Sequence, residues 1–217
     1  MMPDHKHQDP AVHAAFLRDL VLTRYAEDGG YCAMAAVSLM ACDDRGGDVP
    51  KGVSVVLGTL VRTLNDNADD GPRQELLPFL PRLLDSADQA ADRQREAALR
   101  HAIEGMVLGA MHHRLTAPLL NLIAAARTRR QAAAAWRASA RHLLHQVGIA
   151  LHAEAAMALA AAALEEDPGL ASLLCCQALG IEVRCHSMAV WDQALELLDD
   201  LIRMDGREQQ SAEARAA

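Results

Sequence analysis

Five histidines and one glutamate are spaced so that they could build a metal or haem site. Six of the ten histidines lie between positions 101 and 152, in two stretches with helical periodicity. At 100° per residue, the candidates on each helix fall within an arc of about 80°. They are His101, Glu104 and His112 on one helix and His142, His145 and His152 on the next. If the arcs face each other, the six side chains converge inside a helical bundle. Imidazole and carboxylate ligands together suit Zn, Fe, Cu or Ni.

The same residues allow a second interpretation, in which the histidines are structural or face solvent. The order His101-x-x-Glu104 is the reverse of the Glu-x-x-His motif of ferritin-like di-iron proteins. A di-iron site also uses about four carboxylates, whereas this set contains one. The sequence therefore leaves two alternatives: a metal- or haem-dependent enzyme or sensor, and a protein without such a site.

Five cysteines could also carry chemistry, but their spacing favours a structural role. Cys175 and Cys176 are adjacent, and Cys185 precedes His186. Ten residues of helix separate Cys175 from Cys185 by about 15 Å along the axis, so the two cannot share one metal ion. We expect them to be buried as small hydrophobic residues. The odd number and the lack of a Cys-x-x-Cys motif predict free thiols in a reducing compartment.

Aspartates gather where two neighbouring helices are expected to end. Such clusters bind Mg²⁺-diphosphate in all-α terpene enzymes, which makes Mg-dependent diphosphate chemistry a third functional alternative. Ala68 and Leu77 stand where a calcium loop needs ligands, so calcium binding is excluded here. Solvated turns are the simpler interpretation. The aspartates are Asp43, Asp44 and Asp48 in one cluster and Asp66, Asp69 and Asp70 in the other.

Helical spacing of apolar residues, with turn signals between them, divides the chain into about eight helices. Pro78 and Pro81 interrupt an apolar stretch, so two short helical turns are expected over 75–84. Ser86 and Gln89 form a capping box at the start of a long helix. The expected helices span 11–27, 31–42, 53–64, 88–115, 118–127, 131–166, 170–184 and 188–204.

Two glycines, Gly105 and Gly109, lie inside the helix expected at 88–115. Glycine costs about 1 kcal/mol relative to alanine in a helix interior, so a packing gain is expected in return. Small residues at four-residue spacing are typical of close helix crossings. The sequence therefore predicts tight packing of this helix against a neighbour at these positions.

The composition favours one all-α domain. The chain has 217 residues, 43 of them alanine, and aromatic residues make up 3%. Alanine costs no side-chain entropy in a helix, whereas aromatic and β-branched residues favour strands. Hydrophobic residues make up 51%, enough to bury a core. We expect a disordered N-terminus over 1–10, a single compact multi-helix bundle over 11–206 and a frayed tail over 207–217.

The charge and the apolar patterning narrow the class of partner and the compartment. The formal net charge is -8, which repels nucleic-acid phosphates, so no nucleic-acid partner is expected. No apolar run reaches the ~20 residues that span a bilayer, so no membrane partner is expected. The N-terminus lacks the apolar segment of a signal peptide. Together with the expected free thiols, these features predict a cytoplasmic protein.

Two segments resemble a group of Ala-rich helical proteins common in actinobacteria. The first is 60–84, with Leu-Pro-Phe-Leu-Pro-Arg-Leu at 77–83, and the second is 194–202, Ala-Leu-Glu-Leu-Leu-Asp-Asp-Leu-Ile. The resemblance covers about a third of the chain. That group has no established activity, so the resemblance implies a bacterial, cytoplasmic, helical protein and supplies no site or substrate.

The sequence thus predicts an all-α bundle and leaves its function open among three hypotheses. The favoured one is a helical binding or adaptor protein that self-associates, binds a protein partner or takes a small-molecule ligand. The second is the metal- or haem-dependent enzyme or sensor built on the histidine arcs. The third is Mg-dependent diphosphate chemistry at the Asp-rich helix ends.

Overall fold

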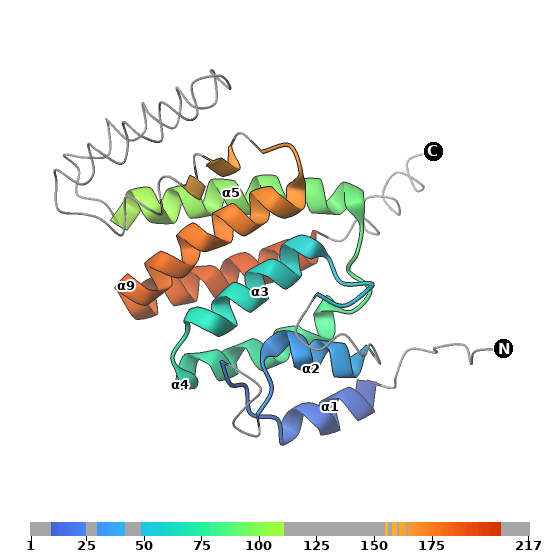
Figure 1. Ribbon diagram of the computed structural model, residues 1–217. Helices are drawn as coiled ribbons and strands as arrows, with labels where there is room; N and C mark the ends of the chain where they lie inside the picture. The colour runs from blue at the N-terminus through green and yellow to red at the C-terminus, as the bar shows by residue number, and fades with distance from the viewer. Residues whose placement is uncertain are drawn as a thin grey trace.

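Seven helices account for most of the chain that the computed structural model describes, namely residues 10–24, 30–41, 49–110, 155, 158–159, 161–163 and 165–204 (Figure 1). They are α1 (Pro10–Arg18), α2 (Ala33–Met40), α3 (Val55–Asn67), α4 (Asp70–Arg73), the 3₁₀-helix η2 (Gln74–Leu83), α5 (Gln89–Ala110) and α9 (Pro168–Arg203). The described residues contain no strand, only an isolated parallel bridge between Leu22 and Tyr31. The predicted all-α bundle is confirmed, with seven helices in this part of the chain against about eight expected. None of the seven is long and apolar enough to cross a bilayer.

Helix α3 forms where apolar residues repeat at helical spacing, and it lies in the middle of the bundle. Ser54 precedes the helix, and its hydroxyl accepts a hydrogen bond from the backbone N–H of Leu57 at 3.2 Å, which satisfies one of the free donors of the first turn. The apolar face of α3 packs mainly against α9, and α5 packs against α9 as well. The fully buried residues of that face are Val56, Leu57, Leu60, Val61 and Leu64.

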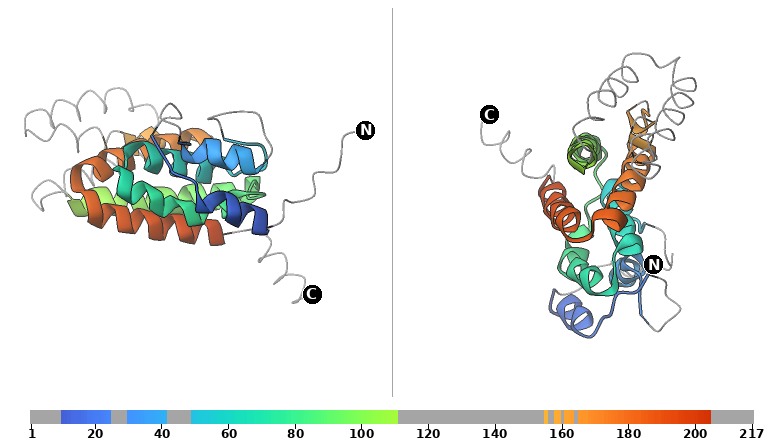
Figure 2. Two further views of the ribbon diagram at one scale, coloured as in Figure 1. Left: turned by 90° about the horizontal axis from the view of Figure 1, so that it is seen from below. Right: turned by 90° about the vertical axis from the view of Figure 1, so that its left-hand side faces the viewer.

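Helix α9 turns back on itself, so that its two arms lie side by side (Figures 1 and 2). A straight helix of 36 residues would extend about 54 Å. However, Arg95 of α5 bonds the carbonyl of Leu201, while its chain neighbour Glu96 lies close enough to Cys175 to perturb the pKa of that thiol. The first and second halves of α9 therefore both contact α5 near Arg95 and Glu96. We call 168–184 the first arm and 188–203 the second arm.

The sequence predicts two separate helices in this region, 170–184 and 188–204, and the structure corrects that prediction. The helical conformation is unbroken from Pro168 to Arg203, although its direction changes between the two predicted ranges. No glycine or proline lies between positions 181 and 203, so nothing in the sequence ends the helix there. The second arm is attached to η2 by Arg82, which donates to Asp199 at 2.6 Å and thereby lowers the pKa of that carboxyl group.

A buried polar network joins the start of α3 to α5 and to the end of α9. The guanidinium of Arg95 is fully enclosed and donates to the carbonyl of Ser86 at 2.8 Å, to the carboxylate of Asp92 at 3.1 Å and to the carbonyl of Leu201 at 3.1 Å. Asp92 also accepts a hydrogen bond from the hydroxyl of Ser54. The network places the residue that caps α3 in direct contact with α5.

The predicted capping box at the start of α5 is wrong. Asp88 caps the helix, and its carboxylate accepts hydrogen bonds from the backbone N–H groups of the residues two and three positions later, at 2.8 and 3.2 Å. The hydroxyl of Ser86 instead accepts from the backbone of Ser54 at 3.0 Å and donates to the carbonyl of Leu83 at 2.6 Å. Ser86 therefore belongs to the buried network.

Two further predictions about local structure are wrong for reasons of packing. Helix α1 ends at Arg18 and not near 27, because Leu20 and Leu22 are buried while Val21 between them is exposed, an alternation that suits extended chain. Over 74–83 the two prolines lie within one continuous 3₁₀-helix, where two separate turns were expected. The fixed backbone angle of proline fits 3₁₀ geometry.

The close helix contact that the sequence predicts at Gly105 is not found among the described residues. Gly105 is exposed, and no described atom lies within 4 Å of a Cβ built there. The close approaches are elsewhere: a Cβ at Gly58 would lie 2.7 Å from both Cγ atoms of Val49, and one at Gly180 would lie 2.8 Å from the side-chain nitrogen of Asn67. The second of these contacts sets the distance between α3 and α9.

Several predicted segments fall wholly or partly outside the described residues. These are the end of the helix expected at 88–115, the helix expected at 118–127 and most of the one expected at 131–166. Residues 155, 158–159 and 161–162 of that last range are helical, as predicted, whereas 163, 165 and 166 are not, so the predicted end at 166 is wrong. The division into a disordered N-terminus, one domain and a frayed tail stays a prediction.

Replacing Arg95 with methionine should destabilise the protein strongly, because Asp92 would keep a buried charge without its guanidinium partner. We expect the free energy of unfolding to fall by about 3–5 kcal/mol, measured by urea denaturation. Arg93→Met in the same helix is the matched control, since Arg93 is exposed and should cost less than about 0.5 kcal/mol. Equal losses in the two variants would contradict this account.

Alanine substitutions at two helix glycines should change stability in opposite directions. Gly58→Ala forces a methyl group against the stiff side chain of Val49, and we expect a loss of about 1–3 kcal/mol. Gly105→Ala meets no described neighbour and gains helix propensity, so we expect a gain of up to about 1 kcal/mol. Thermal and urea unfolding measure both, and a destabilised Gly105→Ala variant would disprove the assignment of Gly105 to an open helix surface.

Candidate functional site

The structure describes two of the six residues of the predicted metal or haem site. His101 and Glu104 lie on α5, where His101 is exposed and Glu104 is buried. The other four, His112, His142, His145 and His152, lie outside the described residues. In the part of the chain that the structure describes, no group of three or more histidine, cysteine or acidic side chains could hold a metal ion. The site built on the two histidine arcs stays a prediction.

The second acidic cluster, Asp66, Asp69 and Asp70, lies at the end of α3 and is described in full. Asp70 is exposed and forms an ion pair of 2.5 Å with Arg73, whose buried guanidinium also donates to the carbonyls of Asn65 at 2.8 Å and Ala68 at 2.5 Å. Asp69 is exposed, as a solvated turn predicts. Asp66 is half-buried and lines a groove. The first cluster, Asp43, Asp44 and Asp48, lies outside the described residues.

That groove, of about 650 Å³, runs between α3 and the first arm of α9. The two helices point in the same direction, because Val55 of α3 lies beside Gly169 and Asn67 lies beside Gly180 (Figure 1). Helix α3 presents side chains one turn apart on the same face. Those lining the groove from α3 are Arg62, Thr63, Asp66 and Asn67.

The first arm forms the opposite wall with residues that also share one helix face. Gly180 is in close contact with α3, because the amide of Asn67 packs over it and donates to the carbonyl of Thr63 at 2.8 Å. Because glycine has no side chain, the amide can lie directly against the helix backbone. The first arm contributes Cys176, Gln177 and Arg184 among its lining residues.

The thiol in this wall is not a nucleophile at neutral pH. Burial raises the pKa of Cys176 to about 12, against smaller lowering effects of a hydrogen bond from Thr63 and the charge of Arg62. Burial also raises the pKa of the adjacent Cys175 well above its usual range. Both thiols are free and fully buried, which confirms the predicted role of this pair as small hydrophobic residues.

The positive charges in the groove are two arginines, one from each wall. Arg62 is half-buried and Arg184 is exposed. Neither guanidinium forms a hydrogen bond or ion pair with another described residue. Asp66 lies one turn after Arg62 but accepts a hydrogen bond from the amide of Asn65 at 3.2 Å instead. The groove therefore offers two guanidinium groups and one carboxylate.

A smaller cavity of about 160 Å³ continues the groove towards the turn of α9. Asn67 and Arg184 line both spaces, so the two are contiguous. The wall of the smaller cavity is mixed: Pro72 and Trp191 lie in it together with the charged side chains of Arg24 and Asp69. The indole nitrogen of Trp191 donates to the carboxylate of Glu75 at 3.2 Å, which holds the ring between the second arm and η2.

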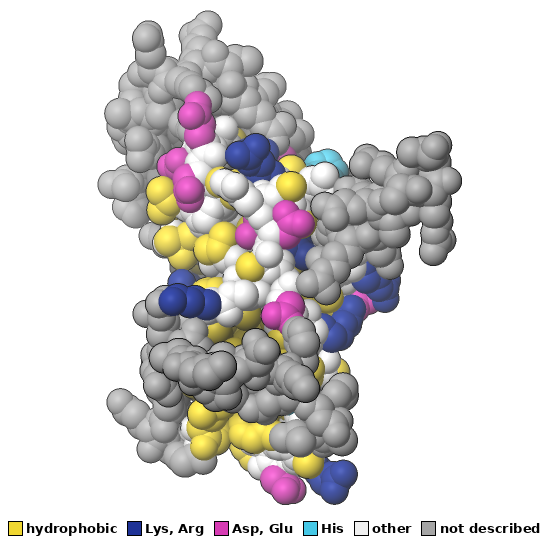
Figure 3. Space-filling model, turned by 90° about the vertical axis from the view of Figure 1, so that its right-hand side faces the viewer, with side chains coloured by type: hydrophobic (Ala, Val, Ile, Leu, Met, Phe, Trp, Pro, Cys, Tyr) yellow, Lys and Arg dark blue, Asp and Glu magenta, His cyan; other side chains and the backbone are white. Residues whose placement is uncertain are grey.

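One face of the molecule carries a mixed surface. On the side shown in Figure 3, acidic, basic and hydrophobic side chains are interspersed. The large exposed hydrophobic residues of the described chain are scattered over several elements. They are Val21, Tyr31, Leu39, Val55, Leu170, Met188 and Met204.

Comparison with models of known protein families, with curated proteins and with solved structures found no match. The groove therefore has to be interpreted from its own residues. Sequence patterns did not single out Arg62, Asn67 or Arg184 as site residues. The available signal was Gly180, a glycine inside an apolar helical segment, which costs helix stability unless a neighbouring element packs closely there.

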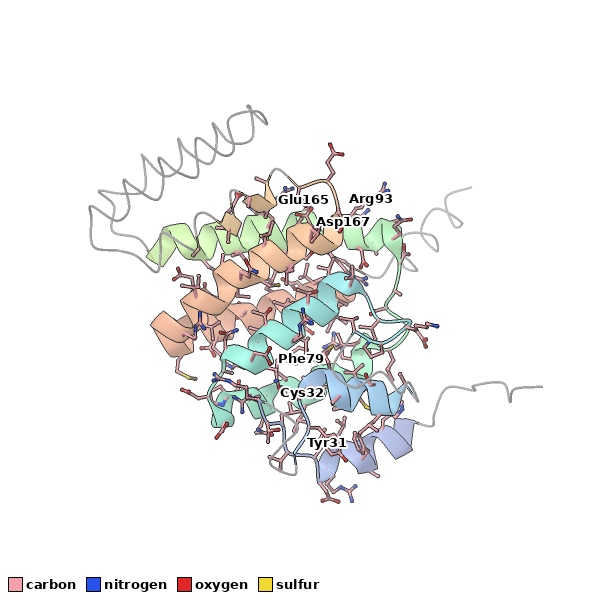
Figure 4. The ribbon with its side chains drawn as sticks, in the orientation of Figure 1. Tyr31, Cys32, Phe79, Arg93, Glu165 and Asp167 are labelled. Carbon is pink, nitrogen blue, oxygen red and sulfur yellow. The ribbon has the colours of Figure 1, made fainter. Side chains whose placement is uncertain are left out.

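The cysteines should differ in reactivity towards iodoacetamide in the native protein. Cys32 is partly exposed on the segment before α2 (Figure 4) and should be alkylated, whereas Cys175 and Cys176 should react only after unfolding. With a pKa of about 12, roughly one Cys176 thiol in 10⁵ is ionised at pH 7. Peptide mass spectrometry reads each position, and alkylation of native Cys176 as fast as Cys32 would contradict the buried assignment.

Folding raises the pKa of Cys176 from 9.0 to about 12, so the unfolded chain loses this proton first and the free energy of unfolding should fall as the pH rises above about 9.

Proposed function

We propose that this chain is a helical binding protein, and that the groove between α3 and the first arm of α9 holds a small-molecule ligand. The observation that carries the proposal is the groove itself, whose volume of about 650 Å³ lies within the range of about 300–1,000 Å³ typical of small-molecule sites. Apart from Ala158, its lining comes from two helices packed side by side, which keep the lining side chains at fixed positions.

The chemistry of the groove favours binding over covalent catalysis. The side chains that line it include charged groups, amides and a hydroxyl, which can orient a ligand by hydrogen bonds, beside apolar ones such as Leu173 and Ile181. The nucleophilic atom among them, the sulfur of Cys176, is protonated at neutral pH and buried. A thiol in that state does not attack a substrate.

We propose a bacterial cytoplasm as the location. The resemblance of segments 60–84 and 194–202 to Ala-rich actinobacterial proteins supports it. The free thiols of Cys32, Cys175 and Cys176 also support it, since thiols persist in a reducing compartment. Self-association or a protein partner remains part of the hypothesis, and the exposed Val55 and Leu170 at the starts of α3 and the first arm are its candidate contacts.

The proposal can be tested by affinity selection of small molecules from a bacterial metabolite extract, read by mass spectrometry. We expect the native protein to retain at least one compound at near-equimolar amounts. Gln177→Trp should abolish retention, because Gln177 is an exposed residue of the groove wall and an indole there fills the groove without disturbing the core.

Gln193→Trp provides the matched control, since Gln193 is exposed on the second arm, outside both cavities. It should retain the same compound as the native protein. The proposal fails if the native protein retains nothing, or if the two tryptophan variants behave alike.

A further inference from the structure

The two walls of the groove each supply one guanidinium group, and this pairing indicates a class of ligand. Thr63, next to Arg62 in the chain, hydrogen-bonds Cys176, so Arg62 lies near the level of Cys176 on the first arm. Arg184 follows eight residues later, about 12 Å further along that arm. Both side chains line the same groove, so a ligand within it meets a positive charge from either side.

Arg62 also lacks the ion pair that its helix position offers. Asp66 is four residues later, the spacing at which opposite charges pair on a helix surface. The two do not form an ion pair in the structure, and Arg62 has no other partner among the described residues. Arg184 has none there either. The charge of both guanidinium groups is thus available to a ligand, in a chain whose formal net charge is -8.

We infer that the groove binds a small organic anion with a phosphate or carboxylate group, attracted by Arg62 on one wall and Arg184 on the other. This inference rests on the proposed binding function and specifies its ligand. Guanidinium groups bind both kinds of anion through charge-assisted hydrogen bonds. The side-chain amide of Gln177, an exposed residue of the same wall, adds a donor that no described residue uses.

Asp66 indicates that the ligand also carries a hydrogen-bond donor group. Its carboxylate opposes a bare anion but accepts hydrogen bonds from a hydroxyl or amino group. The adjoining cavity of about 160 Å³, whose wall holds Trp191 beside Arg24 and Asp69, leaves room for a further part of the ligand. The ligand is therefore an organic anion that also carries a donor group, and an inorganic anion binds more weakly because of Asp66.

Isothermal titration with two simple probes, inorganic pyrophosphate and succinate, tests the inference and separates phosphate from carboxylate recognition. Titrations at low ionic strength with EDTA present limit screening and remove metal-mediated binding. We expect Arg62→Gln and Arg184→Gln each to weaken the tighter probe by roughly 10- to 100-fold. Arg93→Gln, at the outer edge of α5 far from the groove (Figure 4), is the charge-matched control and should leave the affinity unchanged.

Asp66→Asn supplies a gain of affinity that a misfolded variant cannot imitate. It removes the opposing charge and keeps the oxygen that accepts from Asn65, so pyrophosphate or succinate should bind roughly two- to tenfold more tightly. The inference is overturned if neither probe binds, if Arg93→Gln weakens binding as much as the groove variants, or if Asp66→Asn fails to strengthen it. If neither anion binds while Gln177-dependent retention of metabolites persists, the anion inference fails and the binding function stands. If both experiments fail, so do both proposals.

Discussion

The guanidinium of Arg95 lies in the interior where α3, α5 and the second arm of α9 meet, and the arrangement of these three elements depends on it. A buried positive charge is tolerated when it is paired with an opposite charge and hydrogen-bonded. Here Asp92 neutralises it, and the carbonyls of Ser86 and Leu201 accept its hydrogen bonds. Since Asp92 also accepts from Ser54, the start of α3 cannot shift along α5 without breaking the network.

A second buried arginine, Arg73, stabilises the opposite end of α3. Arg73 donates to the carbonyls of Asn65 and Ala68, which a helix end leaves without partners. These carbonyls carry the negative end of the helix dipole, and Arg73 compensates it. The groove lies along α3 towards this end.

Composition and periodicity predict the architecture of this protein well, because they depend on local properties. Alanine content and the spacing of apolar residues predict α3, α5 and the two arms of α9. The errors occur where tertiary contacts decide: Ser86 joins a network with Ser54 and does not cap α5. The extended chain at Leu22 depends on Gln74, which accepts a hydrogen bond from its backbone at 2.9 Å across 52 positions of sequence. The groove is missed for the same reason, since its walls come from segments more than 100 residues apart.

The long separation between Arg95 and its acceptor on Leu201 also bears on how the chain acquires its fold during synthesis. The two residues are 106 positions apart. A ribosome adds about 5–20 residues per second, so about 5–20 seconds pass between the synthesis of Arg95 and that of Leu201. During this interval the apolar faces of α3 and α5 lack the partner that covers them. The nascent chain therefore exposes hydrophobic surface for seconds, which makes it a substrate for chaperones and sensitive to aggregation until α9 emerges.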